Sequence, residues 1–354
     1  MRKLLLSSLG IFTMLSSPAQ AQIPASTEND AVFSDFAFGT GEKLSELKIH
    51  YTSLGTPKRD KDGNITNAVM ILHGTGGTGK QFFQPQFANE LFGPGQVLDT
   101  ARYFIILPDN IGHGQSSKPS DGLRMAFPKY DYDDMVTAQY RLVTENLGIK
   151  KLKLILGTSM GCMHGFVWAT RYPDAVEKLA PFACLPVEIA GQNRMWRKLS
   201  MEAIKTDPAW QGGNYTTPPM AGLRTAASLS IIAGANPLAL QAQYPTRDAA
   251  EKYLEEAFQR TVFRNDANDI IYQLDSSRTY NPWPHLEKIR TPMLWINSAD
   301  DFINPFNYGI TEQAMKRMPT AKFILIPASP ETKGHGTHTW AKFWKDDLAR
   351  LLAQ

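Results

Sequence analysis

The sequence predicts an α/β fold: a mainly parallel sheet with helices on both faces, and a helical cap inserted before one of the last strands. Two observations predict this arrangement. Short apolar segments of strand length alternate along the chain with longer segments of helical spacing, which is typical of parallel sheets covered on both sides. One interval late in the chain is far longer than a normal connection between a strand and a helix, which indicates an insertion.

Apolar segments of strand length supply the predicted sheet. The polar loop Gly55–Asn64, with the turn pair Asp62-Gly63, separates the first two of them. The third ends at Pro108-Asp109, as a short buried strand does where the chain leaves a sheet. The predicted strands are Leu47–Leu54, Asn67–Leu72, Arg102–Leu107, Lys153–Leu156, Lys178–Ala183, Met293–Ile296 and Lys322–Ile326.

Segments with helical spacing lie between and after these strands. In Asp133–Leu147 the apolar residues recur with helical spacing, and Gly148 follows where the C-cap glycine of a helix commonly lies. Met160–Arg171 is expected to form a helix that ends before Pro173. A closing helix is expected at Thr339–Leu352.

The long interval separates the strand that ends near Cys184 from the strand that begins at Met293. It holds about a hundred residues, whereas such connections usually hold about 2–6. Its sequence is compatible with helices and rich in Met and aromatic residues. We therefore predict a helical cap over residues 187–287, inserted into a catalytic domain made of residues 22–186 and 288–354.

The N-terminal 21 residues have the three regions of a secretory signal peptide. Arg2 and Lys3 precede the mostly apolar stretch Leu4–Leu15, and Ala19-Gln20-Ala21 supplies small residues at a cleavage site. The apolar stretch is too short to cross a hydrocarbon core of about 30 Å, so no stable membrane anchor is expected. The sequence therefore predicts an exported protein, periplasmic or secreted.

The charge balance argues against nucleic acid as a partner. The chain has 37 basic and 34 acidic residues, a formal net charge of +3. No run of Lys and Arg is long enough to form a phosphate-binding stripe. Removal of Arg2 and Lys3 with the predicted signal peptide would lower the positive charge further.

The motif Gly157-Thr158-Ser159-Met160-Gly161 carries the first chemical signal. G-x-S-x-G is informative here because it follows a predicted strand and opens a predicted helix, the context of a nucleophile elbow in α/β-hydrolases. The sharp turn would lift the Ser159 hydroxyl clear of the sheet. It would also leave the Met160 N–H free at a helix N-terminus, where a developing oxyanion is stabilised.

A nucleophilic serine needs a base and an orienting acid, which follow it in the order Asp/Glu then His in this fold. Asp301 comes just after the strand Met293–Ile296, and His335 lies in a loop after the last strand. We prefer Asp301 over its neighbour Asp300 because in related hydrolases the acid precedes a loop proline by four positions. We prefer His335 over His338 because His338 begins the predicted closing helix and is expected to pack or cap it.

The loop His73-Gly74-Thr75-Gly76-Gly77 is where this superfamily places the second oxyanion donor. We expect the Thr75 and Met160 N–H groups to hold the oxyanion and the His73 ring to support the loop. His113 is expected to shape the pocket wall. No spacing of histidine and carboxylate resembles a metal site, and no cofactor is expected.

The pairing of the only two cysteines is left open by the sequence. Cys162 and Cys184 both fall near the carboxyl edge of the predicted sheet, and two cysteines of an exported protein can pair. Both also lie in apolar segments, where a free cysteine behaves as a small hydrophobic residue.

Several longer segments resemble the homoserine O-acetyltransferase branch of the α/β-hydrolase superfamily. The resemblance is carried by Leu91–Ile105, Gly157–Met163, Trp168–Asp174 and, in the cap, Asp207–Trp210 and Gly213–Tyr215. It implies the triad Ser159–Asp301–His335 and an acyl-serine intermediate. The sequence departs from the family pattern at Thr158 and Cys162, where the family typically has Gly, in the His73 loop, after His335, and at Ala227, where the family has a cap arginine.

Export suggests water as the acyl acceptor, because acetyl-CoA is a cytosolic metabolite. We therefore predict an exported serine hydrolase that cleaves a small carboxylic ester, a lactone or a small amide through an acyl-serine. One alternative is an acyltransferase of the resembled kind that uses acetyl-CoA. Another is a non-catalytic protein that binds a ligand in the cap. The oligomeric state stays open, with a dimer among the alternatives.

Overall fold

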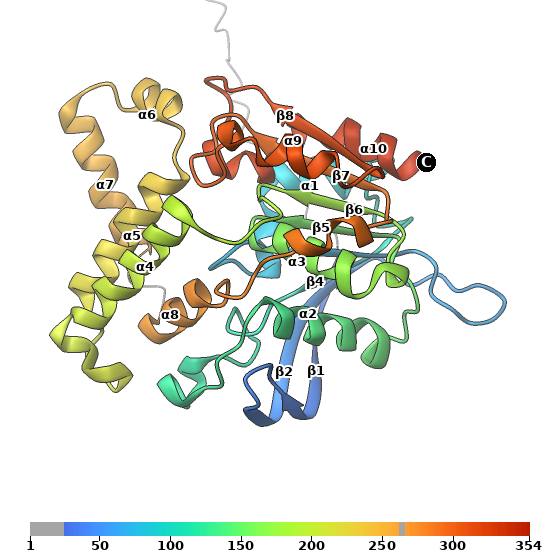
Figure 1. Cartoon of the computed structure of the whole chain (residues 1–354), viewed down its shortest axis with the longest axis horizontal. Coiled ribbons are helices and arrows are strands. Elements are labelled where there is room, and N and C mark those ends of the chain that lie inside the picture. The colour runs from blue at the N-terminus through green and yellow to red at the C-terminus, as the bar shows by residue number, and fades with distance from the viewer. Residues whose placement is uncertain (1–24, 262–265) are drawn as a thin grey trace, which may run out of the picture.

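The computed structural model describes residues 25–261 and 266–354 as an eight-stranded sheet with helices on both faces (Figure 1). The strand order is β1-β2-β4-β3-β5-β6-β7-β8. All neighbouring pairs from β4 to β8 are parallel, and the β1–β2 and β2–β4 pairs are antiparallel. The predicted fold class is thereby confirmed. The predicted signal peptide lies outside the described residues.

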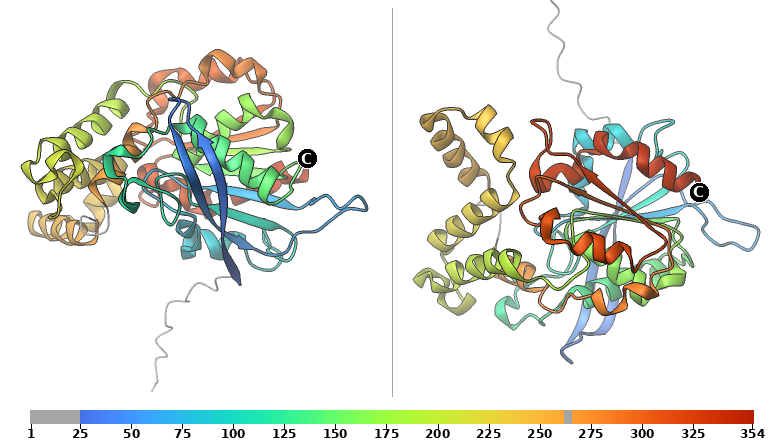
Figure 2. Two further views of the ribbon diagram at one scale, coloured as in Figure 1. Left: turned by 90° about the horizontal axis from the view of Figure 1, so that it is seen from below. Right: turned by 45° about the horizontal axis from the view of Figure 1, so that its top comes forward.

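Each predicted strand has a counterpart within a few residues of the predicted bounds. The structure adds β1, which sequence reasoning missed because most of its side chains are polar and exposed. The strands are β1 Ser26–Ala37, β2 Lys43–Leu54, β3 Ala68–Leu72, β4 Phe104–Pro108, β5 Leu154–Thr158, β6 Leu179–Phe182, β7 Met293–Ser298 and β8 Ala321–Ile326. In Figure 2, β1 and β2 form a long hairpin along one edge of the sheet.

Alternate side chains of the central strands enter two separate cores. In β3, Met70 and Leu72 join one cluster, and Val69 and Ile71 join the other. This alternation follows from the pleat of a strand, which points successive side chains to opposite faces. Because both faces are buried, these strands read in the sequence as continuous apolar runs.

Helices complete the two cores. α2 (Tyr132–Arg141), α3 (Met160–Arg171) and α9 (Ile310–Met315) contribute buried residues to one core. α1 (Pro85–Leu91) and α10 (Lys345–Ala353) contribute to the other. The sheet is therefore covered on both sides, and α3 has the bounds predicted for it.

Two predicted helices differ from those observed. The segment from 133 to 147 is α-helical to Arg141 and then continues as a π-helical turn, Leu142–Asn146, before Gly148. The closing helix begins at Lys345 rather than Thr339, because residues before it form the separate 3₁₀ turns Gly334–Thr339 and Ala341–Phe343.

The segment between β6 and β7 is largely helical. Its helices are α4 Gly191–Thr206, α5 Met220–Gly234, α6 Pro237–Gln243, α7 Arg247–Thr261 and α8 Ala267–Asp275. In Figures 1 and 2, α4 to α7 stand to one side of the sheet. Helices of this segment, α8 included, share an apolar core that contains Met201, Leu223 and Ile271. The exact limits at residues 187 and 287 stay a prediction.

Close packing of α4 on α5 depends on a glycine. A Cβ atom added to Gly222 would lie 2.5 Å from the Ala203 carbonyl oxygen, so a larger residue would push the two helices apart. Among residues 25–261 and 266–354, no helix combines the length and the apolar composition needed to span a membrane.

Candidate active site

Ser159 lies in a tight turn between β5 and α3. Its backbone has φ 55° and ψ −108°, a conformation that costs a non-glycine residue about 1–3 kcal/mol. The neighbouring glycines make the turn sterically feasible: a Cβ atom on Gly157 would lie 2.0 Å from the Gly161 carbonyl oxygen, and one on Gly161 would lie 2.2 Å from that of Leu72. The sequence order strand, turn and helix therefore presents the serine hydroxyl above the sheet.

The structure brings Ser159, His335 and Asp301 into one hydrogen-bonded chain. The distance between Ser159 Oγ and His335 Nε2 is 2.8 Å, and the distance between His335 Nδ1 and Asp301 Oδ2 is also 2.8 Å. With Nδ1–H donating to the carboxylate, Nε2 can accept the serine proton. Ser159 follows β5, Asp301 follows β7 and His335 follows β8. The carboxyl ends of these parallel strands lie at the same edge of the sheet.

Asp301 is buried and is held by the turn that follows it. Its Oδ1 accepts hydrogen bonds from the Ile303 N–H at 2.8 Å and the Asn304 N–H at 3.1 Å, and its Oδ2 accepts one from Asn304 Nδ2 at 3.1 Å. Burial alone would raise the pKa of the Asp301 carboxyl, but His335 and the Asn304 donors outweigh it, so the pKa lies below its usual value. The group is therefore anionic at neutral pH. Sequence reasoning missed Asn304; its position directly before Pro305 was the available signal.

The neighbouring carboxylate, Asp300, has a different set of partners. It accepts hydrogen bonds from the Ser298 hydroxyl, from Thr332 Oγ1 at 2.7 Å and from the Gly334 N–H at 3.1 Å. Asp300 thus fastens the loop that carries His335, while Asp301 contacts the imidazole itself.

His338, the alternative base, packs beside His335 instead of facing Ser159. The two rings lie edge to face with their centres 5.2 Å apart. The His338 side chain is half-buried, and the backbone carbonyl oxygen of His338 accepts a hydrogen bond from the Trp344 indole at 3.2 Å. It lies within a 3₁₀ turn and does not begin α10.

The loop after β3 passes directly beside Ser159. A Cβ atom on Gly74 would lie 3.3 Å from Ser159 Cβ and 3.9 Å from its Oγ. Thr75, the next residue, lines the same cavity as Ser159 and His335. Met160 is the first residue of α3, where the backbone N–H has no acceptor within the helix. Both predicted oxyanion donors therefore lie on the segments that flank the serine.

Two buried histidines hold that loop. His73 Nδ1 lies 2.8 Å from the Gly74 carbonyl oxygen, and its Nε2 accepts from the Asn110 N–H at 3.1 Å. His113 Nδ1 lies 2.9 Å from the Ile111 carbonyl oxygen, and its Nε2 accepts from the Gly76 N–H at 3.3 Å. Burial lowers the pKa of His73 to about 4 and that of His113 to about 3, so both are neutral supports at neutral pH.

A cavity of about 340 Å³ opens over the serine between the sheet domain and the cap helices. Its floor holds Thr75, Ser159 and His335. Most of its wall is apolar and comes from α5 and α8, including Leu223, Ala226, Ala227, Ala233, Ile270 and Leu274. Among the described parts of the chain, no group of His, Cys, Asp and Glu is arranged to hold a metal ion.

Comparison with known proteins decides the family. The family model described as the alpha/beta hydrolase fold matches residues 67–328. A homoserine O-acetyltransferase of Carboxydothermus hydrogenoformans is 30% identical over 343 residues, covering 86% of this chain and 88% of the relative. The chain belongs to the homoserine O-acetyltransferase branch of the α/β-hydrolases. A homoserine O-succinyltransferase of Magnetococcus marinus is 29% identical over 285 residues, covering 70% of this chain and 71% of the relative.

Solved structures agree on the fold of this acyltransferase-branch chain. The homoserine O-acetyltransferase of Bacillus anthracis superposes with a TM-score of 0.82 at 21% identity, covering 94% of this chain and 98% of that one. An acetylester hydrolase of Corynebacterium glutamicum gives a TM-score of 0.79, also at 21% identity, covering 93% and 96%. At this identity the structures speak for the architecture and not for the reaction.

The relatives correct the reaction predicted from the sequence. The chain was expected to be an exported esterase because water is the acceptor at hand outside the cytosol. The curated relatives that cover most of the chain are homoserine acyltransferases, which supports the acyltransferase alternative instead. The prediction was wrong because it argued from the surroundings of the protein, which do not determine the acceptor that an acyl-serine enzyme uses. That the chain is an enzyme of the α/β-hydrolase superfamily stands.

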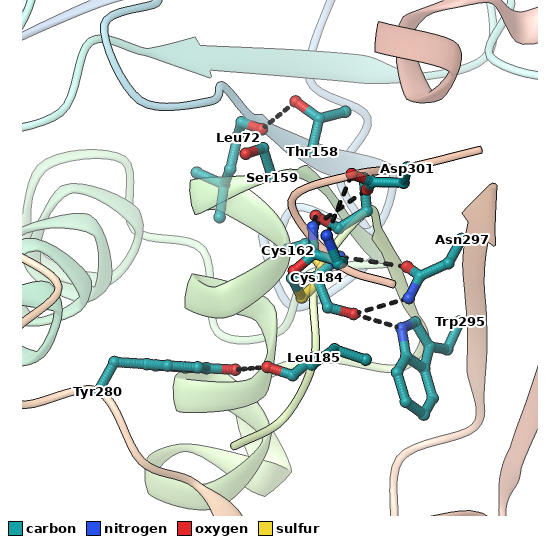
Figure 3. The surroundings of a disulfide bond; sticks show 12 residues. Leu72, Thr158, Ser159, Cys162, Cys184, Leu185, Tyr280, Trp295, Asn297 and Asp301 are labelled. Atoms are coloured by element: carbon teal, nitrogen blue, oxygen red, sulfur yellow. Dashed lines mark hydrogen bonds between the residues drawn. A yellow bond between two sulfur atoms is a disulfide. The ribbon is translucent and has the colours of Figure 1, made fainter. Parts of the chain in front are cut away.

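A disulfide joins Cys162 and Cys184 beneath Ser159 of this acyltransferase-branch chain (Figure 3). Cys162 lies in the first turn of α3, and Cys184 follows β6. The Cys184 carbonyl oxygen also accepts hydrogen bonds from the Trp295 indole at 3.0 Å and Asn297 Nδ2 at 3.1 Å. The two cysteines are therefore paired, and their bond links α3, which follows Ser159, to the chain that leaves β6.

We expect the double variant Cys162→Ala/Cys184→Ala to be less stable by about 3 kcal/mol, the loop-closure value for the 22-residue separation of the two cysteines. Urea denaturation of the oxidised protein and of the double variant measures the difference. The reduced native chain is the control, and it should resemble the variant. Equal midpoints for all three would contradict a stabilising bond.

Buried histidines are expected to make the fold sensitive to acid. Burial lowers the pKa of His73 to about 4 and the pKa values of His113 and His338 to about 3, against about 6.5 when unfolded. Below pH 6.5 the unfolded chain therefore binds more protons, and at pH 5 each histidine lowers the free energy of unfolding by about 2 kcal/mol. Asp134 and Asp269, whose pKa values burial raises to about 6, act in the opposite direction and offset part of the loss.

Urea denaturation at pH 7 and pH 5 measures this loss. His164→Leu tests its origin, because burial also lowers the pKa of His164 well below its usual value. The variant should lose less stability between the two pH values than the native chain does. An identical loss in both proteins would contradict the proposed role of buried neutral histidines.

Proposed function

We propose that this enzyme transfers an acetyl group from acetyl-CoA to the hydroxyl group of homoserine through an acetyl-serine at position 159. The observation that carries the proposal is the identity with homoserine O-acetyltransferases, which extends over 86% of the chain in one case and so includes the cap as well as the catalytic residues. The hydrogen-bonded chain Ser159–His335–Asp301 at the floor of the cap cavity supplies the chemistry.

In the first half of the reaction, His335 Nε2 takes the proton of the Ser159 hydroxyl as its oxygen attacks the thioester carbonyl carbon. The carbonyl oxygen becomes an oxyanion, which the N–H groups of Thr75 and Met160 stabilise. The carbon–sulfur bond then breaks, His335 gives its proton to the departing sulfur, and CoA leaves with its thiol restored. Asp301 stabilises the imidazolium that exists between these two proton transfers.

The second half reverses these roles. The homoserine hydroxyl gives its proton to His335 and attacks the acetyl carbonyl carbon on Ser159. The bond to Ser159 Oγ breaks, and the proton from His335 restores the serine hydroxyl as O-acetylhomoserine leaves.

Purified protein, acetyl-CoA and homoserine test the proposal directly. We expect one O-acetylhomoserine, quantified by mass spectrometry, for each CoA released. Omission of homoserine should slow CoA release after the first turnover, because the acetyl-enzyme then waits for an acceptor. CoA release accompanied only by acetate, with no O-acetylhomoserine at saturating homoserine, would contradict the proposal.

We also propose that the chain is exported after removal of residues 1–21. Support comes from the signal-like N-terminal sequence and from the Cys162–Cys184 bond, since structural disulfides form in oxidising compartments. An exported enzyme would need an acyl donor available outside the cytosol, and a serine nucleophile can accept an acyl group from esters as well as thioesters. Cell fractionation and N-terminal sequencing test this: the mature chain should begin at Gln22, and a cytosolic chain that retains Met1 would contradict export.

A further inference from the structure

A buried arginine faces the catalytic cavity without a carboxylate partner. Arg197 belongs to α4 and lines the cavity together with Ser159 and His335. Its side chain is among the largest that are fully buried, with an exposed fraction of 2%. Its Nε donates to Asn193 Oδ1 at 2.9 Å, whereas its Nη1 is buried and has no hydrogen-bond partner among the described residues.

Three charged groups on α4 and on the two helices that pack against it, α5 and α8, have partners other than Arg197. Arg194, one turn earlier on α4, is paired with Asp275 of α8, Nη2 to Oδ1, at 3.3 Å. On α8, Asp269 accepts hydrogen bonds from the backbone and hydroxyl of Ser120. On α5, the guanidinium of Arg224 pairs with Glu255 at 2.9 Å.

The remaining neighbours of the Arg197 guanidinium are uncharged. It lies 5.0 Å from the centre of the Trp196 ring. Burial lowers its pKa, and the nearby Tyr132 hydroxyl opposes that shift. An arginine stays protonated even so, and within the described parts of the chain it has no ion pair.

A lone buried cation is costly unless an anion and hydrogen bonds compensate it. Resting on the proposed function, we infer that Arg197 is a specificity residue which binds a carboxylate group of the substrate in the cavity over Ser159. The free Nη1–H is a ready donor for a charge-assisted hydrogen bond to such a group.

The wall of the cavity that α5 forms carries no positive charge at Ala226 and Ala227. Ala227 of α5 presents only a methyl group to the cavity. Methyl groups at Ala226 and Ala227 leave room on that wall, and the guanidinium reaches the cavity from α4 instead. The cation therefore enters from a different helix, at a position that no sequence motif marks.

Two substrates could bring the carboxylate. It could belong to the acceptor, as the α-carboxylate of homoserine does. It could also be the free carboxylate of a dicarboxylic acyl group such as succinyl. Both offer the same two oxygens to the guanidinium, so the donor and the acceptor must be varied independently.

The acceptor arm compares homoserine with homoserine amide, using acetyl-CoA as donor. The variant Arg197→Met removes the charge and keeps much of the side-chain volume. We expect it to lower kcat/KM for homoserine by about 30-fold or more, as for loss of one partner of a buried charge pair, and to leave the value for the amide within about 3-fold. The donor arm compares succinyl-CoA with acetyl-CoA in the presence of the amide. A loss confined to succinyl-CoA would assign the carboxylate to the acyl group.

The matched control is Arg194→Met, which removes a neighbouring cation that already has its own carboxylate partner. It should leave the homoserine-to-amide ratio unchanged. If Arg197→Met lowers the rates for charged and neutral substrates equally, the inference is overturned. If that variant fails to fold, Arg197→Lys decides: a point charge in place of the planar fork should reduce the carboxylate preference, and an unchanged preference would overturn the inference.

A binding measurement separates this inference from the proposed function. In Ser159→Ala protein, 4-hydroxybutyrate should raise the melting temperature and 4-hydroxybutyramide should not, and Arg197→Met should abolish the difference. If the native enzyme forms no O-acetylhomoserine, the proposed function is contradicted. A melting-temperature shift that is selective for the carboxylate and depends on Arg197 would still support the inference. Equal shifts with both compounds, together with no loss confined to succinyl-CoA in the donor arm, would overturn it.

Discussion

Replacement of Ser159 with alanine is expected to lower kcat for acetyl transfer by at least about 10⁴-fold, because no acetyl-enzyme can form without the hydroxyl. The oxyanion segments and the cavity would persist, so acetyl-CoA should still bind. Intact-mass measurement after mixing with acetyl-CoA checks the cause: the native chain should gain one acetyl group and the variant none. A fluorophosphonate probe should likewise label only the native chain.

The matched control for this prediction is Ser228→Ala. Ser228 lies on α5, outside the cavity, and its hydroxyl donates to the Arg224 carbonyl oxygen at 2.8 Å. This variant should keep nearly all activity and should still be acetylated at Ser159. Acetylation of Ser159→Ala protein at another residue, with turnover preserved, would show that the nucleophile lies elsewhere.

Asp301→Asn is expected to lower kcat by about 10⁴-fold, since an amide in that place favours the wrong imidazole tautomer and cannot stabilise the imidazolium. The pKa of Asp301 lies below its usual value, so the native carboxylate is ionised throughout the neutral range. Protonation of Asp301 itself should therefore add nothing to the pH dependence of the native rate from about pH 6 to 8. Rate measurements across that range, with acetyl-CoA and homoserine saturating, give the size of the loss at each pH.

Asp300→Asn is the control, because the adjacent residue has the same charge and different partners. It accepts from Thr332 and Gly334 in the loop that carries His335 and does not touch the imidazole. We expect a lower melting temperature and a much smaller loss of kcat than for Asp301→Asn. The reverse ranking of the two variants would assign the catalytic acid to Asp300.

The sheet was predictable because a strand buried on both faces appears in the sequence as a continuous apolar run. β3 and β5 are apolar at nearly every position, and α3 begins at the glycine-flanked turn and ends before Pro173. β1 could not be found in this way, since it lies at the sheet edge and only some of its side chains are buried. The start of α10 depends on tertiary packing of Trp344, which is buried against Phe87 and Phe182.

The site was predictable where its chemistry follows from a motif and not where it follows from packing between distant elements. Ser159 and His335 stand out by spacing and loop position, and the structure brings them to hydrogen-bonding distance. The division of labour between Asp300 and Asp301 depends on which oxygen faces which loop, and it appears only in three dimensions. Arg197 carries no motif at all; its isolation from carboxylates is a property of how α4 packs.

The oxidation state of Cys162 and Cys184 also records the redox environment in which each molecule folded. In the folded chain the bond joins α3, which packs against β5 and β6, to the segment that follows β6. A molecule that folds and stays where thiols remain reduced would keep two extra hydrogens. The intact mass of the protein taken from its native cells would therefore tell in which redox surroundings each molecule matured.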